Sequence, residues 1–145
     1  MLSCTEFIPA YSHLFQFIED RAGHAGVEAY WAFISDNYVA DSLGRAVAEK
    51  GIEGCWDYWS HSLNEEAADF TMTLDEEAGE FSIEMHHCPS KGRLLELTHV
   101  TPYYDYCGHC DLLYRRVLEG QGFQYDYDDS GCDHAACTLR VHAPK

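Results

Sequence analysis

Positively charged residues are scarce in this sequence. It holds 9 lysines and arginines against 25 aspartates and glutamates, for a formal net charge of −16 at pH 7. A field of that sign repels nucleic-acid phosphates and anionic lipid headgroups, because both are themselves negative. Neither nucleic acid nor a membrane surface is therefore expected as a partner. An anionic small molecule would need the few basic residues of the C-terminal half, which are Lys91, Arg93, Arg115, Arg116 and Arg140.

Long apolar runs are also missing. No stretch reaches the roughly 18 apolar residues that suggest a membrane-spanning helix, so no such helix is expected. The first residues show no basic region followed by an apolar run, so no secretory signal is expected either. Together these absences predict a cytoplasmic protein.

Apolar residues are nevertheless abundant enough for a core. Hydrophobic residues make up 46% of the 145 residues and aromatic residues 14%, which argues against disorder. We expect one domain over residues 1–145. Its helical part covers residues 1–66 and its cysteine-rich α+β part covers residues 67–145.

Helical spacing of apolar residues dominates the first part. Pro9 is expected to open the first helix and Gly23 to end it. Asp41 is expected to cap a short third helix that ends at Gly51. The pattern predicts four helices, at residues 9–22, 25–39, 41–51 and 53–63.

The period changes from helical to alternating near residue 70. Residues 70–74 and 81–85 alternate between apolar and polar side chains and predict a β-hairpin whose second strand leads to Cys88. Residues 123–127 and 135–142 predict a second hairpin on the same grounds.

A helix is expected between the two hairpins. Thr101 is a suitable N-cap, Pro102 suits the first helical position, and Gly120 or Gly122 would end the helix. Before it, residues 89–92 break the strand and residues 93–97 form at most one helical turn.

The predicted architecture is therefore α+β. N-terminal helices pack with a hairpin–helix–hairpin unit, which forms a four-stranded, mostly antiparallel sheet with its helix across one face.

The sequence contains seven cysteines, which are the main candidates for a functional site. An odd number with no expected export argues against a disulfide framework, and clustered cysteines and histidines in a reducing compartment indicate metal binding or catalysis. Four cysteines are expected to meet in this fold, namely Cys88, Cys107, Cys110 and Cys137. Whether Cys132, His134, His86 or His87 join them stays open.

Three kinds of site fit these residues. In the first, Cys88, Cys107, Cys110 and Cys137 bind zinc or iron, either as four structural ligands or as a catalytic set that leaves a position for water. In the second, Cys107 is a thiolate nucleophile, and Asp111 or His109 transfers the proton. In the third, Cys107 and Cys110 form a redox-active C-x-x-C pair.

Three features in order characterise the cysteine-rich part. A strand ends in Cys88, a helix carries Cys107 followed within a turn by Asp111, and a final hairpin has Gly131 in its turn and Cys137 late. In this order, residues 70–142 resemble the aminothiazoline carboxylate hydrolase-like family. The resemblance implies a small-molecule pocket near these cysteines and hydrolysis of a C–N bond in a small sulfur-containing heterocyclic amino acid. Cys110 and the neighbouring His109 depart from the family pattern and favour a bound metal.

We therefore expect a small-molecule enzyme, a metal-dependent hydrolase-like or lyase-like protein that acts on a small polar or sulfur-containing substrate. The alternatives are a non-catalytic zinc- or iron-binding module with structural cysteines and a C-x-x-C thiol–disulfide redox protein.

Overall fold

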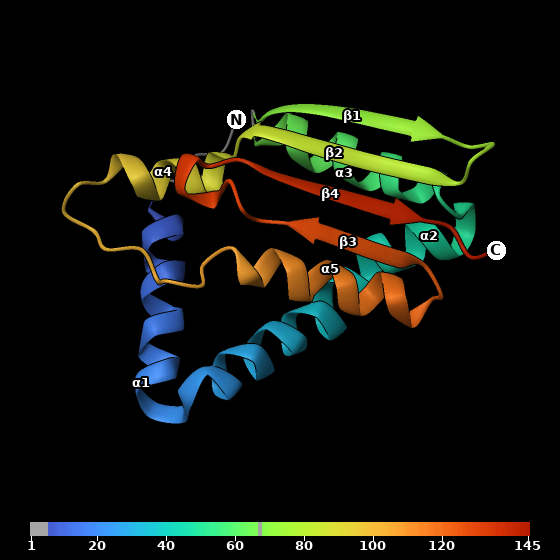
Figure 1. Ribbon diagram of the computed structural model, residues 1–145. Helices are drawn as coiled ribbons and strands as arrows, with labels where there is room; N and C mark the ends of the chain where they lie inside the picture. Colours follow the sequence, from blue (N-terminus) through green and yellow to red (C-terminus); the bar gives the residue numbers. More distant parts are fainter. Residues whose placement is uncertain (1–5, 67) are drawn as a thin grey trace.

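The computed structural model describes residues 6–66 and 68–145 (Figure 1). The elements follow in the order α1 (Phe7–Ile34), the π-helical segment η1 (Ser35–Gly44), α2 (Arg45–Lys50), α3 (Glu53–Glu65), β1 (Asp69–Asp75), β2 (Glu80–His87), α4 (Pro89–Glu96), α5 (Gly108–Gly120), β3 (Gln124–Asp128), the 3-10 turn η2 (Cys132–His134) and β4 (Cys137–His142).

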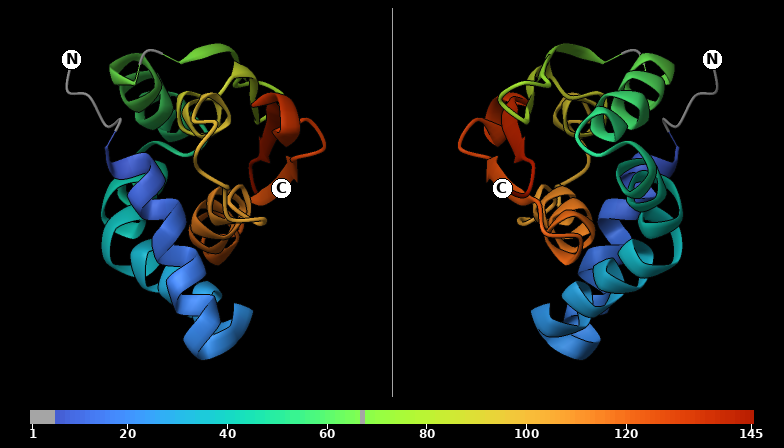
Figure 2. Two further views of the ribbon diagram at one scale, coloured as in Figure 1. Left: turned by 90° about the vertical axis from the view of Figure 1, so that its left-hand side faces the viewer. Right: turned by 90° about the vertical axis from the view of Figure 1, so that its right-hand side faces the viewer.

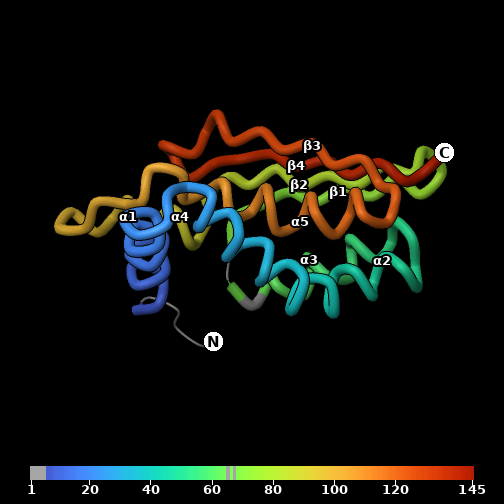
Figure 3. The backbone as a smooth tube through the Cα atoms, turned by 90° about the horizontal axis from the view of Figure 1, so that it is seen from below, coloured from blue at the N-terminus to red at the C-terminus, as the bar shows by residue number. Residues whose placement is uncertain are grey.

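The strands form the predicted sheet. Within the described ranges it has four strands in the order β1-β2-β4-β3, and every neighbouring pair is antiparallel. Helices α2, α3 and α5 lie on one side of the sheet (Figure 3). The α+β prediction is confirmed, including the helix that crosses one face.

Helix α1 bends sharply where the sequence predicts a stop. Gly23 adopts φ 70° and ψ 178°, which only glycine adopts readily, and the two arms of α1 form a V (Figure 1), which Figure 2 shows from the side. The helix begins at Phe7, two residues before the predicted start. Pro9 is tolerated there because the first N–H groups of a helix have no intrahelical partner.

No new helix begins at Asp41, so that prediction is wrong. The second arm of α1 continues through η1 into α2 without a break, and Asp41 lies inside η1. The continuous path lets Val39 and Leu43 face the core together, 2% and 0% exposed. Gly51, with φ 61°, ends the path as predicted.

Helix α5 begins at Gly108, seven residues after the predicted N-cap Thr101. A tertiary hydrogen bond replaces the helical one, since the Tyr103 N–H donates to the Ser12 hydroxyl of α1 at 2.8 Å. The rings of Tyr103 and Tyr106 are both buried in this non-helical segment. Burying two aromatic rings against α1 outweighs the local helix signal of Thr101 and Pro102.

Helix α4 is longer than predicted. Residues 89–92 were expected only to end the strand, but Pro89 opens a helix that runs to Glu96. Proline is well suited to this first helical position. Cys88 is consequently the N-cap of a helix and also the residue that follows β2.

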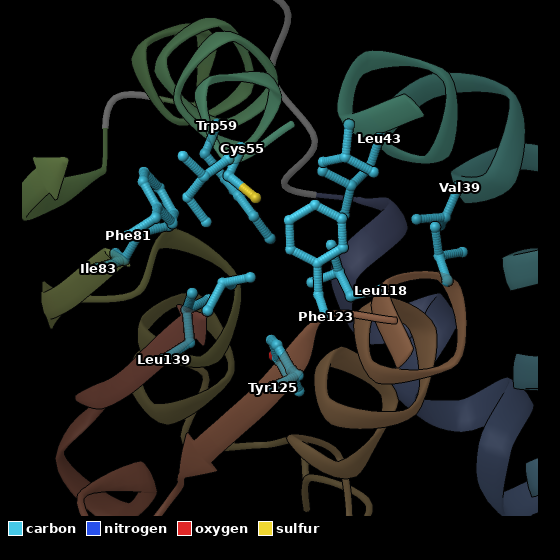
Figure 4. Close-up of a cluster of buried hydrophobic side chains, with 14 of the residues drawn as sticks. Val39, Leu43, Cys55, Trp59, Phe81, Ile83, Leu118, Phe123, Tyr125 and Leu139 are labelled. Carbon is cyan, nitrogen blue, oxygen red and sulfur yellow. The ribbon is translucent and has the colours of Figure 1, made fainter. Parts of the chain in front are cut away.

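Two hydrophobic clusters hold these elements together. The larger lies between the sheet and the helices α3, α5 and η1, and Trp59 stacks on Phe81 with ring centroids 5.5 Å apart (Figure 4). The smaller joins α1 to α4 and the segment before α5, around Phe15, Val27, Trp31, Leu94, Tyr103 and Tyr106. None of the helices in residues 6–66 and 68–145 combines the length and apolar character needed to span a membrane.

The close contact between α2 and α3 gives a test of packing. A Cβ atom on Gly54 would lie 2.3 Å from the Ala46 carbonyl oxygen and 2.6 Å from the Val47 nitrogen. Gly54→Ala is therefore expected to lower the free energy of unfolding by roughly 1–3 kcal/mol through overpacking. Urea denaturation measures the change.

The matched control is Gly120→Ala. No atom lies within 4 Å of the added Cβ there, and the residue ends helix α5. Alanine is the better helix former by up to about 1 kcal/mol, so this variant should be as stable as wild type or slightly more so. Equal stability of the two variants would contradict the proposed contact between α2 and α3.

Candidate functional site

A cavity of about 200 Å³ lies between the sheet, α3, α4 and the start of α5. Five cysteines line it, which are Cys88, Cys107, Cys110, Cys132 and Cys137. They come from the β2–α4 junction, the start of α5, the turn η2 and strand β4. The four cysteines predicted to meet do meet, and Cys132 joins them. Cys4, the first cysteine of the chain, lies outside the described residues.

The remaining lining is largely aromatic and aliphatic. Trp59, Tyr106, Tyr114 and Tyr127 contribute rings to the wall. An engineered apolar cavity of about 150 Å³ is large enough to bind benzene. This cavity therefore has room for one small ring with a substituent or two.

Lys91 is the one lysine or arginine among the described residues that line the cavity. Its side chain is only 8% exposed, although it belongs to helix α4 near the surface. The ammonium group acts to lower the pKa of Cys88, Cys107 and Cys132, while the cost of burial raises all three. The sequence indicated that a site for an anion needs one of the few basic residues, but nothing in it singles out Lys91.

Cys88 occupies the N-cap of helix α4. Its Sγ accepts a hydrogen bond from the backbone N–H of Lys91 at 3.4 Å. Burial raises the pKa of Cys88, whereas the N–H groups of Lys91 and Ser90 and the Lys91 ammonium act in the opposite direction. Unpaired N–H groups and the macrodipole at a helix N-terminus stabilise negative charge, so they favour the thiolate of Cys88.

Cys107 occupies the corresponding N-cap position of α5, not the second turn of a helix as predicted. Its side chain does not cap the helix. Burial raises the pKa of Cys107, and so does the hydrogen bond that its thiol donates to Cys132. The two helix N-termini, those of α4 and α5, thus each place a cysteine at the same cavity.

His109 and Cys110 form a second pair. Nδ1 of His109 bonds the Tyr106 carbonyl, which can only accept, so Nδ1 carries the proton. Nε2 then accepts from the Cys110 thiol across 3.4 Å. The imidazole ring packs edge-on against Tyr11 and tilted against Phe15, with centroids 5.4 and 5.6 Å apart. Burial lowers the pKa of His109 to about 4 and raises that of Cys110.

Cys137 is the remaining cysteine of the cavity wall. Burial and the neighbouring Cys88 raise the pKa of Cys137 to about 11. A hydrogen bond from the Tyr127 hydroxyl acts in the opposite direction.

Asp111 lies apart from this group. Its carboxylate oxygen Oδ1 accepts from Nε and Nη2 of Arg115 at 2.9 and 2.7 Å, and the residue does not line the cavity. The histidines left open also lie elsewhere, since His86, His87 and His134 are not part of the lining. His86 instead bonds the hydroxyl of Thr71 at 3.0 Å.

A metal site needs at least three suitably placed donors. In the part of the chain that the structure describes, no three His, Cys, Asp or Glu side chains form a group that could hold a metal ion. Cys88, Cys107, Cys110 and Cys137 share a cavity without being arranged as a ligand set. Three of these four cysteines bond other side chains instead: Cys107 to Cys132, Cys110 to His109 and Cys137 to Tyr127.

The buried state of His109 predicts a pH effect on stability. Its pKa is about 4 in the fold and 6.5 ordinarily, so between these values the unfolded chain binds more protons. Stability should therefore be lost as pH falls from 6.5 towards 4, by about 3 kcal/mol from this group. His109→Asn retains a donor to the Tyr106 carbonyl but cannot titrate.

The measurement is urea denaturation of wild type and His109→Asn at pH 7 and pH 4. Acidic residues titrate in both proteins, so the informative quantity is the difference between them. Wild type should lose more stability than the variant over this interval, because only wild type has the buried His109. His13→Asn, an exposed histidine on α1, serves as the control and should follow wild type. Identical losses in wild type and His109→Asn would contradict a buried neutral imidazole.

Comparisons with known proteins identify no relative. No protein-family model, no curated protein and no solved structure matches this chain. Its function is consequently argued from the cavity itself.

Proposed function

We propose that the chain is a small-molecule enzyme that opens a C–N bond of a small polar or sulfur-containing molecule through a cysteine nucleophile. One observation carries the proposal. Five thiols from four separate segments and a single buried ammonium group, that of Lys91, converge on one cavity of about 200 Å³.

The cavity also suggests the class of substrate. Its volume suits a single small ring, and its aromatic and thiol-rich wall favours a flat, polarisable one. The buried ammonium of Lys91 would pair with one negative group, such as a carboxylate, in a protein that otherwise repels anions. A sulfur-containing heterocyclic acid, the class implied by the family resemblance, has these properties.

Cys88 is the nucleophile that the geometry favours best. It alone among the five cysteines accepts a hydrogen bond from a backbone N–H at a helix N-terminus, and it lies near the Lys91 ammonium. Cys107, the nucleophile predicted from the sequence, lacks such a donor, and its thiol instead donates a hydrogen bond to Cys132. We assign Cys107 to the wall of the substrate site and keep it as the second choice of nucleophile.

The reaction then has two steps. The sulfur of Cys88 bonds the carbon of the C–N group, the C–N bond breaks, and the nitrogen leaves with the proton of the thiol. Water next adds to the same carbon, the C–S bond breaks, and the Cys88 thiol is restored. The net change is hydrolysis of the C–N bond by one water molecule.

His109 and Asp111 are the other residues predicted to be catalytic, and we propose a supporting role for His109 only. His109 reaches the cavity wall but is held by Tyr106 and Cys110, so we propose that it positions Cys110. Asp111 is paired with Arg115, and we propose no part for it in the reaction. Zinc and iron are not included, because the described side chains offer no set of three ligands.

The environment proposed for the enzyme is a reducing one such as the cytoplasm. The six cysteines among the described residues are all free thiols. Reducing compartments keep cysteines in this state.

Cys88→Ser tests the proposed nucleophile. With 2-aminothiazoline-4-carboxylate as substrate, we expect kcat/KM to fall by a factor of about 10³ or more, because serine at this position is a far weaker nucleophile than a thiolate. Cys55→Ala is the control, since Cys55 is a core cysteine outside the cavity. Wild-type turnover by Cys88→Ser would contradict the assignment, and absence of hydrolysis by the wild-type chain would contradict this choice of substrate.

Lys91→Met tests the proposed contact with the anionic group. The two side chains are similar in length, so the change removes the charge with little change in packing. We expect KM to rise roughly tenfold, equivalent to about 1.4 kcal/mol of binding free energy, and kcat to change less. An unchanged KM for the carboxylate substrate would show that Lys91 does not bind it.

A further inference from the structure

Cys107 and Cys132 meet at the cavity from two different segments. Cys107 immediately precedes α5, and Cys132 is the first residue of the turn η2. Their thiols are hydrogen-bonded to each other, and both line the cavity. The two sulfur atoms are therefore neighbours in the reduced protein.

The backbone fixes both positions. The Cys132 N–H donates to the Asp129 carbonyl at 2.9 Å, and its own carbonyl accepts from the N–H of Ala135 at 3.1 Å. Ala135, at φ 58°, in turn accepts from the Cys88 N–H at 2.7 Å, which ties this turn to the end of β2. Cys107 is held at the first turn of α5, where its carbonyl accepts from the N–H of Cys110.

We propose that Cys107 and Cys132 form a reversible disulfide by exchange with a small disulfide such as oxidised glutathione. The pairing differs from the C-x-x-C pair of Cys107 and Cys110 suggested by the sequence. Cytosolic disulfides of this kind are typically transient and redox-sensing.

Exchange proceeds in two balanced steps. The Cys132 thiolate attacks one sulfur of the small disulfide, forms a mixed disulfide and releases one small thiol. The Cys107 thiolate then attacks the Cys132 sulfur and releases the second small thiol. Overall, the two protein thiols are oxidised by two electrons and the small disulfide is reduced by two.

Cys132 is the residue suited to attack first. It is only half-buried, so a small disulfide in solution can approach its sulfur. Burial raises the pKa of Cys132, but the hydrogen bond from Cys107 and the Lys91 ammonium both act in the opposite direction. Cys107 shares the influence of the Lys91 ammonium, but its hydrogen bond acts in the opposite direction, because as the donor to Cys132 it is stabilised in the thiol form.

Cys110 is a poor partner for Cys107. Its thiol faces Nε2 of His109 at 3.4 Å, and the Cys107 thiol faces Cys132. A bond between Cys107 and Cys110 would require both sulfur atoms to leave their present partners.

The disulfide would also switch the site off. A bond between the start of α5 and η2 would join two segments of the cavity wall and consume two thiols of its lining. This effect on turnover rests on the function proposed above, whereas formation of the disulfide does not.

Peptide mapping of the full chain tests the pairing. Protein treated with oxidised glutathione is blocked with N-ethylmaleimide and cut with trypsin, which places Cys107 and Cys110 in the fragment 94–115 and Cys132 and Cys137 in the fragment 117–140. We expect these two fragments to be covalently joined and to separate on reduction. The link should be lost in Cys107→Ser and Cys132→Ser and kept in the matched controls Cys110→Ser and Cys137→Ser.

Two results would overturn the proposal. One is a folded wild-type chain, verified by circular dichroism, that forms no link between the fragments. The other is a disulfide found within fragment 94–115 alone. Turnover assays on the reduced protein distinguish this proposal from the proposed function. A link between the fragments without hydrolysis would support the disulfide and contradict the enzyme. Hydrolysis without a link would support the enzyme and contradict the disulfide.

Discussion

The hydrogen bond from the Cys88 N–H to the Ala135 carbonyl, 2.7 Å long, joins two segments of the cavity wall that lie far apart in the sequence. The ladder between β2 and β4 ends at Met85 and Cys137, and beyond this pair the two chains diverge, one into α4 and the other back to η2. This bond ties the end of β2 to the residue that follows η2, and both Cys88 and Ala135 line the cavity. The start of α4 is thereby held against the segment that carries Cys132 and Cys137.

Burial in the cavity opposes ionisation of the cysteine thiols that line it. A dry cavity favours binding of an apolar ring, but it also raises the pKa of every cysteine in the wall, and the net charge of −16 disfavours another negative charge. The helix N-terminus at Cys88 and the Lys91 ammonium act in the opposite direction, because both stabilise a thiolate. The groups that stabilise a thiolate at Cys88 thus lie where α4 begins.

Sequence patterns captured the parts of the fold that depend on local periodicity. Alternation predicted both hairpins, and Gly23 and Gly51 marked real changes of direction because their φ angles are positive. The start of α5 was predicted wrongly, because Thr101 and Pro102 give a valid local signal that the buried bond from Tyr103 to Ser12 overrides. Lys91 was among the five basic residues of the C-terminal half, but it could not be singled out, since an isolated lysine on a short helix carries no pattern that reveals burial.

The convergence of Cys88, Cys107, Cys110 and Cys137 was predictable from topology, but their pairing was not. Spacing of three residues places two side chains on one face only if both lie within the helix. Because α5 begins at Gly108, Cys107 precedes it, and its thiol bonds Cys132 while Cys110 bonds His109. The chemical unit is consequently not the C-x-x-C sequence. It is a set of thiols with four different partners: the Lys91 N–H for Cys88, Cys132 for Cys107, His109 for Cys110 and Tyr127 for Cys137. This difference in partners is the basis of the two roles proposed here, a nucleophile at Cys88 and an oxidisable pair at Cys107 and Cys132.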